Sequence, residues 1–268
     1  DVAPSRGLGD VYKRQVPQQI ASGDSTSTDD LYFRDALTVS AGNAHVTLLK
    51  KDGSVWSWGR NNKGQLGQST NGVNNTYKDM QTPDRVLKGE YDTGNADDRY
   101  IKNVDALSAG ENFSVVTTRD RNVYAWGDNT FGQLGGGTTA AKLVTPVAIT
   151  GPNGKVMTNV KSVSVTDNSV LVLTNDGFVY GFGEMFVYNS RKIAQIPNLT
   201  GVAQISGMYA RTTGGMVWRI DESGSPQKVS IKKNNSDVSA VKIVAGRDHL
   251  LILDEDSRVW TYGDNTYG

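Results

Sequence analysis

The sequence contains no cysteine and only two histidines, His45 and His249, among its 268 residues. The absence of cysteine excludes disulfide bonds, thiolate catalysis and zinc sites with cysteine ligands. No apolar run approaches the roughly 18 residues that a membrane-spanning helix needs, so we expect no membrane span. Lys and Arg number 28, as do Asp and Glu, and a chain without net charge has no general attraction for nucleic acid. Nucleic acid is therefore not an expected partner.

What the sequence does have is a repeated pattern of short apolar runs between glycines. In residues 107–135 (LSAGENFSVVTTRDRNVYAWGDNTFGQLG), a small-residue turn precedes one run, a polar turn follows, and a second run ends before a glycine-rich stretch. Such runs, rich in β-branched and aromatic residues, are typical of a β-hairpin. A helix is excluded because about four to six residues between breakers are too few for one of ordinary length.

The pattern occurs five times, with its turn anchored at Gly42, Gly110, Thr166, Gly207 and Gly246. The later anchors are about 40 residues apart, and a period of this length with only strand signals is typical of a β-propeller blade. A proline-containing strand signal precedes each unit, at residues 16–17, 82–86, 145–147, 195–197 and 225–229. Proline suits the edge of a sheet. The sequence therefore predicts an all-β fold, a β-propeller of four-stranded antiparallel blades.

We expect residues 16–268 to form a single propeller domain. Its units are roughly 16–67, 82–135, 145–184, 195–220 and 226–268. Residues 1–15 fit no position of the repeat and are interpreted as a non-native or disordered leader. The wider spacing of the first copies places insertions at residues 68–81 and 88–100, which we expect to be surface loops.

The first copy, AGNAHVTLLKKDGSVWSWGRNNKGQLG at residues 41–67, aligns without gaps with the second copy at residues 109–135. This pattern resembles the regulator of chromosome condensation repeat, whose family forms seven-bladed propellers. The resemblance covers residues 16–268 and implies about five blades of a seven-bladed ring, in a chain truncated at both ends. The third and fourth copies depart from the pattern because they lack the trailing GQLG.

The residue types that most often carry catalysis fall at structural positions of the repeat. His45 and His249 share one position, which Phe113, Ser169 and Ala210 fill in the other copies. We therefore interpret each histidine as a buried imidazole that is hydrogen-bonded to a neighbouring blade.

The aromatic residues also recur at fixed positions, so we expect them to pack blade against blade rather than to form a stacking platform. They are Trp56, Trp58, Tyr124, Trp126, Tyr180, Phe182, Trp218, Trp260 and Tyr262. The acidic run Asp254-Glu255-Asp256 lacks the further ligand of a calcium loop and is interpreted as a plain turn. We expect no catalytic residue, no metal ligand and no cofactor.

Two residues between the turn glycine and the histidine position differ in every copy, although the framework around them repeats. Asn43-Ala44 is interpreted as an ordinary exposed turn. Equivalent loops of a propeller meet on one face, so we expect the other pairs to form a partner-binding surface. These residues are Glu111, Asn112, Asp167, Asn168, Met208, Tyr209, Arg247 and Asp248. Tyr209 and Arg247 are predicted at its centre, because Tyr and Arg anchor many protein interfaces.

The resemblance implies a protein-protein interaction module with no chemistry of its own. The alternative is guanine-nucleotide exchange on a small GTPase, the activity of the family's namesake, for which residues 68–81 or 88–100 would have to supply a wedge-like insertion. We expect a protein partner and no small-molecule substrate. One secreted bacterial branch of the family inhibits β-lactamases, and the absence of cysteine fits such a protein as well as a cytosolic one. We therefore expect the surface or exterior of a bacterium rather than the cytoplasm.

Overall fold

Short β-strands follow one another along the chain and pair into antiparallel sheets. The computed structural model describes residues 19–21, 32–68, 78–91, 94, 98–136, 138, 140–189, 193–264 and 266. Within these residues the helical structure is confined to one short 3-10 helix, η1 (Glu184–Asn189), so the expectation of an all-β fold is confirmed. No helix among them is long and apolar enough to cross a membrane. The leader expected at residues 1–15 lies outside the described residues.

The first three sheets have four strands each, and every strand pairs with the next one in the chain. The first sheet consists of β1 (Ala36–Ala41), β2 (His45–Lys50), β3 (Val55–Gly59) and β4 (Met80–Arg85). The second consists of β5 (Val104–Ala109), β6 (Phe113–Thr118), β7 (Val123–Asp128) and β8 (Lys142–Ala148). The third consists of β9 (Val160–Thr166), β10 (Ser169–Thr174), β11 (Val179–Gly183) and β12 (Ala194–Gln195).

Two further sheets follow in the second half of the chain. The fourth sheet consists of β13 (Val202–Ser206), β14 (Tyr209–Thr212), β15 (Val217–Ile220) and β16 (Pro226–Val229). A small hairpin of β17 (Lys232–Lys233) and β18 (Ser236–Asp237) comes next. The described strands of the fifth sheet are β19 (Ala240–Ala245), β20 (His249–Asp254) and β21 (Val259–Gly263).

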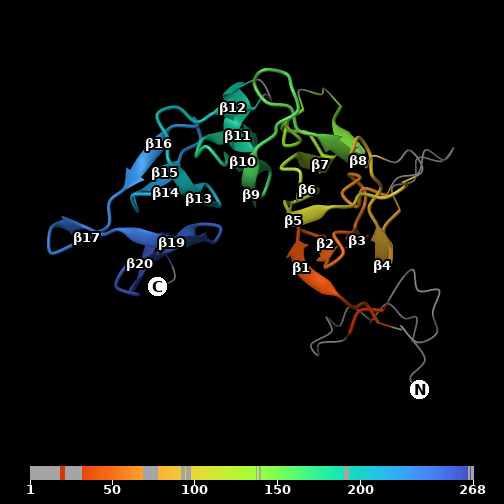
Figure 1. Cartoon of the computed structure of the whole chain (residues 1–268), viewed down its shortest axis with the longest axis horizontal. Coiled ribbons are helices and arrows are strands. Elements are labelled where there is room, and N and C mark those ends of the chain that lie inside the picture. The colour runs from red at the N-terminus through yellow and green to blue at the C-terminus, as the bar shows by residue number, and fades with distance from the viewer. Residues whose placement is uncertain are drawn as a thin grey trace.

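The sheets stand in chain order around an arc (Figure 1). Strands β5, β9 and β13 lie on the inner side of the arc, and β8, β12 and β16 lie on its outer side (Figure 1). The first and fifth sheets form the two ends of the arc. Four-stranded antiparallel sheets arranged radially in this way make a β-propeller, as the sequence predicts.

The hydrophobic core is divided among the interfaces between neighbouring sheets. Trp126 in β7 packs towards the first sheet and has no exposed surface. Phe113 and Phe182 pack together between the second and third sheets and are equally buried. The prediction that the aromatic positions pack blade against blade is confirmed for Trp126 and Phe182. Tyr262 in the fifth sheet differs, because 42% of its surface is exposed.

The proline-containing strands belong to a different sheet from the one expected. Strand β4, which contains Pro83, pairs with β3, and β8, which contains Pro146, pairs with β7. Each therefore closes the sheet of the preceding hairpin instead of opening the next unit, so the units expected to begin at residues 82 and 145 start one strand too early. After each hairpin the chain folds back and pairs with the free edge of that same hairpin. Proline is tolerated there, because the outer edge of the sheet is unpaired.

The strand register also corrects the alignment of the fourth copy by one residue. Tyr209 pairs with Arg219 just as His45 pairs with Gly59 and Phe113 with Gly127. Tyr209 therefore occupies the histidine position, not Ala210 as the sequence alignment predicts. Gly207 resembles the turn glycines of the other copies but does not occupy their position. Ser206 stands at that position instead, and the variable pair of this copy is Gly207-Met208.

In the first two copies, the turn glycine leaves room for the side-chain ring of the residue three positions later. A Cβ atom on Gly110 would lie 2.0 Å from Cε1 of Phe113, and one on Gly42 would lie 2.3 Å from Cε1 of His45. Neither glycine has a positive φ, so space rather than backbone conformation selects glycine here. The third copy has Ser169 in place of a ring and carries Thr166 instead of glycine. The fourth copy is an exception, because Ser206 precedes the ring of Tyr209.

We expect Gly110→Ala to lower the free energy of unfolding by about 1–3 kcal/mol, because the new methyl group overlaps the buried Phe113 ring. Urea denaturation measures the change. Gly136→Ala is the matched control, since its Cβ would lie 3.7 Å from the nearest atom, the carbonyl oxygen of Ala148. Equal stability of the two variants would contradict the packing explanation.

Candidate functional site

The turns between the first two strands of the five sheets surround one hollow on the inner side of the arc, which we call the central hollow. Its volume is about 1230 Å³. The turn residues that line it include Gly42 and Asn43, Gly110 and Glu111, Asp167 and Asn168, Gly207 and Met208, and Arg247 and Asp248. Clustering of these loops on one face is what the sequence predicts. Asn112, which is also a predicted site residue, is not among the lining residues.

Backbone hydrogen bonds link the turns of the first three sheets. The amide of Asn43 donates to the carbonyl of Glu111 at 3.0 Å, and the amide of Glu111 donates to the carbonyl of Asp167 at 2.7 Å. In these three sheets the first residue of the variable pair is thus held by its backbone, which does not depend on its side chain. This explains how the turns differ in side chain without losing their position.

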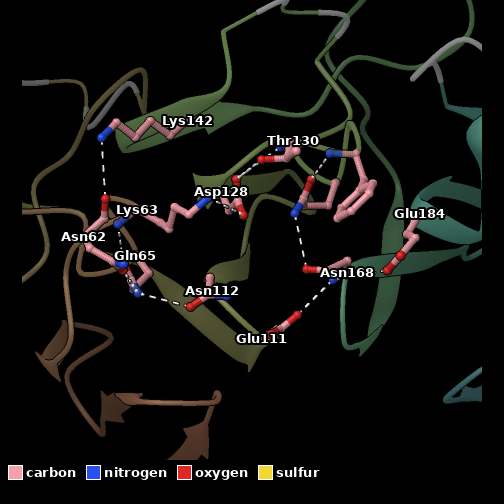
Figure 2. Close-up of polar contacts among 12 residues, drawn as sticks. Asn62, Lys63, Gln65, Glu111, Asn112, Asp128, Thr130, Lys142, Asn168 and Glu184 are labelled. Atoms are coloured by element: carbon pink, nitrogen blue, oxygen red, sulfur yellow. Dashed lines mark hydrogen bonds and ion pairs between the residues drawn. The ribbon is translucent and has the colours of Figure 1, made fainter.

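The second residue of the pair, by contrast, is part of the framework in two copies. The side-chain amide of Gln65, from the glycine-rich turn after β3, donates to Oδ1 of Asn112 at 3.5 Å. Gln133, from the equivalent turn after β7, donates to Oδ1 of Asn168 at 3.4 Å. Figure 2 shows Gln65 reaching across to Asn112 in the next sheet. Asn112 and Asn168 therefore help to connect neighbouring sheets, a role that sequence reasoning missed.

The two glutamines are held in place by their own turns. Oε1 of Gln65 accepts the amide of Lys63 at 2.8 Å, and Oε1 of Gln133 accepts the amide of Phe131 at 2.9 Å. Both side chains are fully buried. The signal is present in the sequence, because GQLG recurs in the first two copies.

Acidic side chains gather on the wall that the second and third sheets contribute. The side-chain amide of Asn168 donates to Oε2 of Glu111 at 2.9 Å and to Oε2 of Glu184 at 3.1 Å. Figure 2 shows Asn168 lying between these two carboxylates. Asp167 is 61% exposed beside them. This wall therefore presents negative charge to the hollow.

Met208 and Tyr209 are less exposed than the sequence interpretation requires. Their exposed fractions are 8% and 9%, and both belong to hydrophobic clusters between sheets. Tyr209, which the sequence predicts at the centre of the partner-binding surface, is instead the first residue of β14 and packs towards the fifth sheet. Its ring meets that of Tyr262 edge to face, with centroids 6.3 Å apart. Burial raises the pKa of Tyr209, and the positive charge of Arg219 opposes this.

Arg247 and Asp248 lie in the turn before β20, and both are exposed. One guanidinium nitrogen of Arg247 lies 3.7 Å from Oδ2 of Asp167, and the Arg247 side chain is 81% exposed. This ion pair joins the fifth sheet to the third across the small residue Gly207 of the fourth. An exposed pair of this kind contributes only about 0–1 kcal/mol to stability.

His45 closes a buried joint between the first two sheets. Its Nε2 lies 3.0 Å from Oγ of Ser114, and Ser114 in turn donates to the carbonyl of Gln65 at 3.2 Å. The indole nitrogen of Trp126 donates to the same carbonyl at 2.8 Å. The imidazole, the Ser114 hydroxyl and the Gln65 carbonyl therefore form one chain of buried polar contacts. The predicted hydrogen bond to the neighbouring blade is confirmed for His45.

His249 does not share this environment, although it occupies the same position of the repeat. It is exposed on the last described sheet, where no further described sheet covers it. The expectation of a buried His249 is therefore wrong, because burial at this position comes from the following sheet.

The acidic turn after β20 is explained by its own hydrogen bonds. Asp254 is 2% exposed, and its Oδ2 accepts Nε1 of Trp260 and Nε of Arg258, both at 2.8 Å. Burial by itself would raise the pKa of Asp254, but the bonds from Trp260 and Arg258 outweigh it and hold the pKa well below its usual range. The carboxylate is thus fully used in the turn, in agreement with the predicted plain turn.

The two predicted insertions are only partly described. Residues 69–77, 92–93 and 95–97 lie outside the described residues. The amide of Glu90 donates to the carbonyl of Pro146 at 2.8 Å, and Oε2 of Glu90 accepts the amide of Ala148 at 2.9 Å. Glu90 of the second insertion therefore packs on outer strand β8, away from the central hollow.

Sequence comparison identifies the repeat. Two models of the regulator of chromosome condensation (RCC1) repeat match the chain, one over residues 37–65, 104–133 and 240–268 and the other over residues 52–117 and 120–173. The chain belongs to the regulator of chromosome condensation repeat family. This confirms the family resemblance seen in the first two copies.

Relatives of this RCC1-repeat chain are eukaryotic. It is 26% identical over 239 residues to the protein RCC2 homolog of Xenopus laevis, and the match covers 84% of this chain and 39% of that protein. The chain thus spans about two fifths of the length of this curated relative. The expectation of a bacterial extracellular or cell-surface protein is wrong, because the matched proteins come from frog, human and yeast.

Solved structures support the same fold. Human WBSCR16 matches with a TM-score of 0.65 and 20% identity, covering 85% of this chain and 61% of that chain. Yeast RCC1 (Prp20), solved bound to Kap60, matches with a TM-score of 0.62 and 21% identity, covering 85% of this chain and 56% of that chain. A further structure of Prp20p from Saccharomyces cerevisiae was described with its binding properties to Gsp1p and histones.

We expect His45→Ala to lower the free energy of unfolding by about 1–3 kcal/mol, because it removes the buried hydrogen bond between His45 and Ser114. Chemical denaturation at neutral pH measures the loss. His249→Ala is the matched control at the same repeat position, and we expect it to change stability by less than about 0.5 kcal/mol. Similar losses in both variants would contradict the assigned roles.

The burial of His45 also predicts that the stability of the fold depends on pH. Burial lowers its pKa to about 4 from 6.5. The unfolded chain takes up the proton first, so the free energy of unfolding falls as pH drops from about 6.5 to about 4, by up to about 3 kcal/mol. Denaturation of the parent and of His45→Phe across this range measures the effect. The difference between them must shrink with falling pH, whereas a constant difference would contradict burial of the neutral imidazole.

Proposed function

We propose that this chain is a protein-interaction module that binds its partner at the central hollow. The observation that carries the proposal is that equivalent turns from five sheets converge there, with side chains that differ from copy to copy. Framework positions of the repeat are used in packing between sheets. The first members of the variable pairs, by contrast, place Glu111, Asp167 and Arg247 on the wall of the hollow.

Protein binding rather than catalysis is the function that these side chains support. Among the described residues no group of three or more His, Asp or Glu side chains could hold a metal ion. The ionisable groups around the hollow are mainly carboxylates and arginines, which suit charge-complementary recognition. Yeast RCC1, which shares the fold, was solved bound to Kap60, and this supports a protein as the partner class.

The second candidate is guanine-nucleotide exchange on a small GTPase. The observation in its favour is the likeness to Prp20p, which was described with its binding to Gsp1p. An exchange function like that of the family's namesake needs an insertion that reaches the GTPase, and within residues 88–100 Glu90 instead packs on β8. We therefore rank binding without exchange first.

The test measures binding of the chain to Gsp1p and to core histones by biolayer interferometry. We expect Asp167→Ala and Arg247→Ala each to weaken the interaction by more than about 1 kcal/mol while leaving the melting temperature unchanged. Glu255→Ala is the control, because Glu255 is exposed in the turn at the opposite end of β20. Unchanged binding in both hollow variants would place the interface elsewhere.

Release of a fluorescent guanine nucleotide from Gsp1p separates the two candidates. We expect the chain to leave the release rate unchanged even where it binds. Acceleration of release by an order of magnitude or more would favour the exchange function instead.

A further inference from the structure

Arg219 stands at a position where every other sheet of the described chain has glycine. Its counterparts, paired in the same register with the first residue of the second strand, are Gly59, Gly127, Gly183 and Gly263. These glycines have φ values between +102° and +129°. A Cβ atom on them would lie 2.2–2.6 Å from the carbonyl oxygen of the adjacent turn. The repeat therefore normally excludes any side chain here.

The fourth sheet departs from this rule and gains a guanidinium group at the hollow. Arg219 does not have a positive φ, and the amide of Ile220 still donates to the carbonyl of Met208 at 2.8 Å, as the equivalent amides do in the other sheets. The hairpin thus keeps its pairing while exposing a long side chain. Arg219 is exposed and is one of the residues that line the central hollow.

Within the part of the chain that the structure describes, the guanidinium of Arg219 forms no ion pair and donates no hydrogen bond. The other arginines of the fourth and fifth sheets are engaged. Arg211 donates to the carbonyl of Thr212, Arg247 faces Asp167, and Arg258 is bonded to Asp254. An exposed arginine without an ion pair contributes little to folding, so its guanidinium group at the hollow is available to a ligand.

The side chains around Arg219 indicate which kind of ligand fits there. Tyr262, an exposed aromatic residue, lines the same wall, and Tyr and Arg are the types that most often anchor interfaces. The second and third sheets contribute the carboxylates of Glu111, Asp167 and Glu184 to the hollow, and Asp248 and Asp264 of the fifth sheet also line it. A strongly acidic polypeptide would be repelled by these groups. One carboxylate in an otherwise neutral or basic segment avoids that repulsion and matches the planar guanidinium in two parallel hydrogen bonds.

We propose that Arg219 anchors a single carboxylate side chain of the partner, carried in a segment whose other residues are neutral or basic and face the acidic wall. This inference rests on the proposed protein-binding function and specifies the chemistry of the partner. Arg219 is a specificity residue for that partner.

The experiment uses three fluorescein-labelled peptides of equal length as probes. The first has one central Glu flanked by Lys residues, the second has Gln in place of that Glu, and the third has Glu in place of every Lys. Fluorescence polarisation with the parent chain should show about a tenfold preference for the first peptide over the second and the weakest binding for the third.

Arg219→Gln should remove the preference for Glu over Gln without changing the melting temperature, and Arg219→Lys should keep part of it. Arg119→Gln, which alters an exposed arginine in the turn between β6 and β7, is the matched control and should keep all of it. Retention of the full preference in Arg219→Gln, or failure of every probe to bind, would overturn the assignment. If Asp167→Ala abolishes peptide binding while Arg219→Gln keeps the full preference for Glu, the peptide binds at the hollow but Arg219 is not its anchor.

Discussion

Each sheet of this chain can bury its apolar faces only against a neighbouring sheet, because a small antiparallel sheet has no core of its own. The hydrophobic clusters accordingly lie between sheets, around residues such as Trp126 and Phe182. Polar side chains of the repeat also connect neighbouring sheets. Gln65 and Gln133 reach from one sheet to the asparagine of the next, and His45 reaches Ser114 in the following sheet. The repeated motif is therefore best understood as the set of residues that makes one sheet fit the next.

This constraint also determines where variation is allowed. A residue that packs against the next sheet cannot change without a matching change across the interface, as the joint replacement of glycine and ring by Thr166 and Ser169 illustrates. The first residue of each inner turn is less constrained, because in the first three sheets backbone hydrogen bonds between Asn43, Glu111 and Asp167 hold the turns together. Its side chain faces the central hollow. Selection for binding can therefore act on these positions without disturbing the fold.

The fold could be predicted from the sequence because the same framework residues recur at a fixed spacing. The glycine and the ring three residues later, the aromatic strand positions and the turn residues all follow from local pattern. Three details could not be predicted in this way. His249 has the same local sequence context as His45, but its burial depends on what lies beside the sheet. Pro83 signals an edge strand but does not say which hairpin it joins.

The third detail concerns the candidate site. Gly207 looks like a turn glycine, and aligning on it moves Tyr209 into the variable pair and hides the correspondence of Arg219 with Gly59. Only the pairing of Tyr209 with Arg219 across the hairpin reveals the shift. A single misplaced residue changes which side chain faces the hollow, since neighbouring residues of a strand point to opposite faces.

The fourth sheet is where the framework is relaxed and where the candidate site gains its distinctive residues. It lacks the glycine-rich turn with its glutamine, it has Gly207 in place of a longer side chain, and it carries Arg219 in place of glycine. The small Gly207 lets Arg247 of the fifth sheet reach Asp167 of the third. Because both members of this ion pair are largely exposed, breaking it costs at most about 1 kcal/mol. A partner that supplies its own carboxylate or cation can therefore replace the pair with little loss of free energy. The ion pair thus does not oppose binding at the hollow.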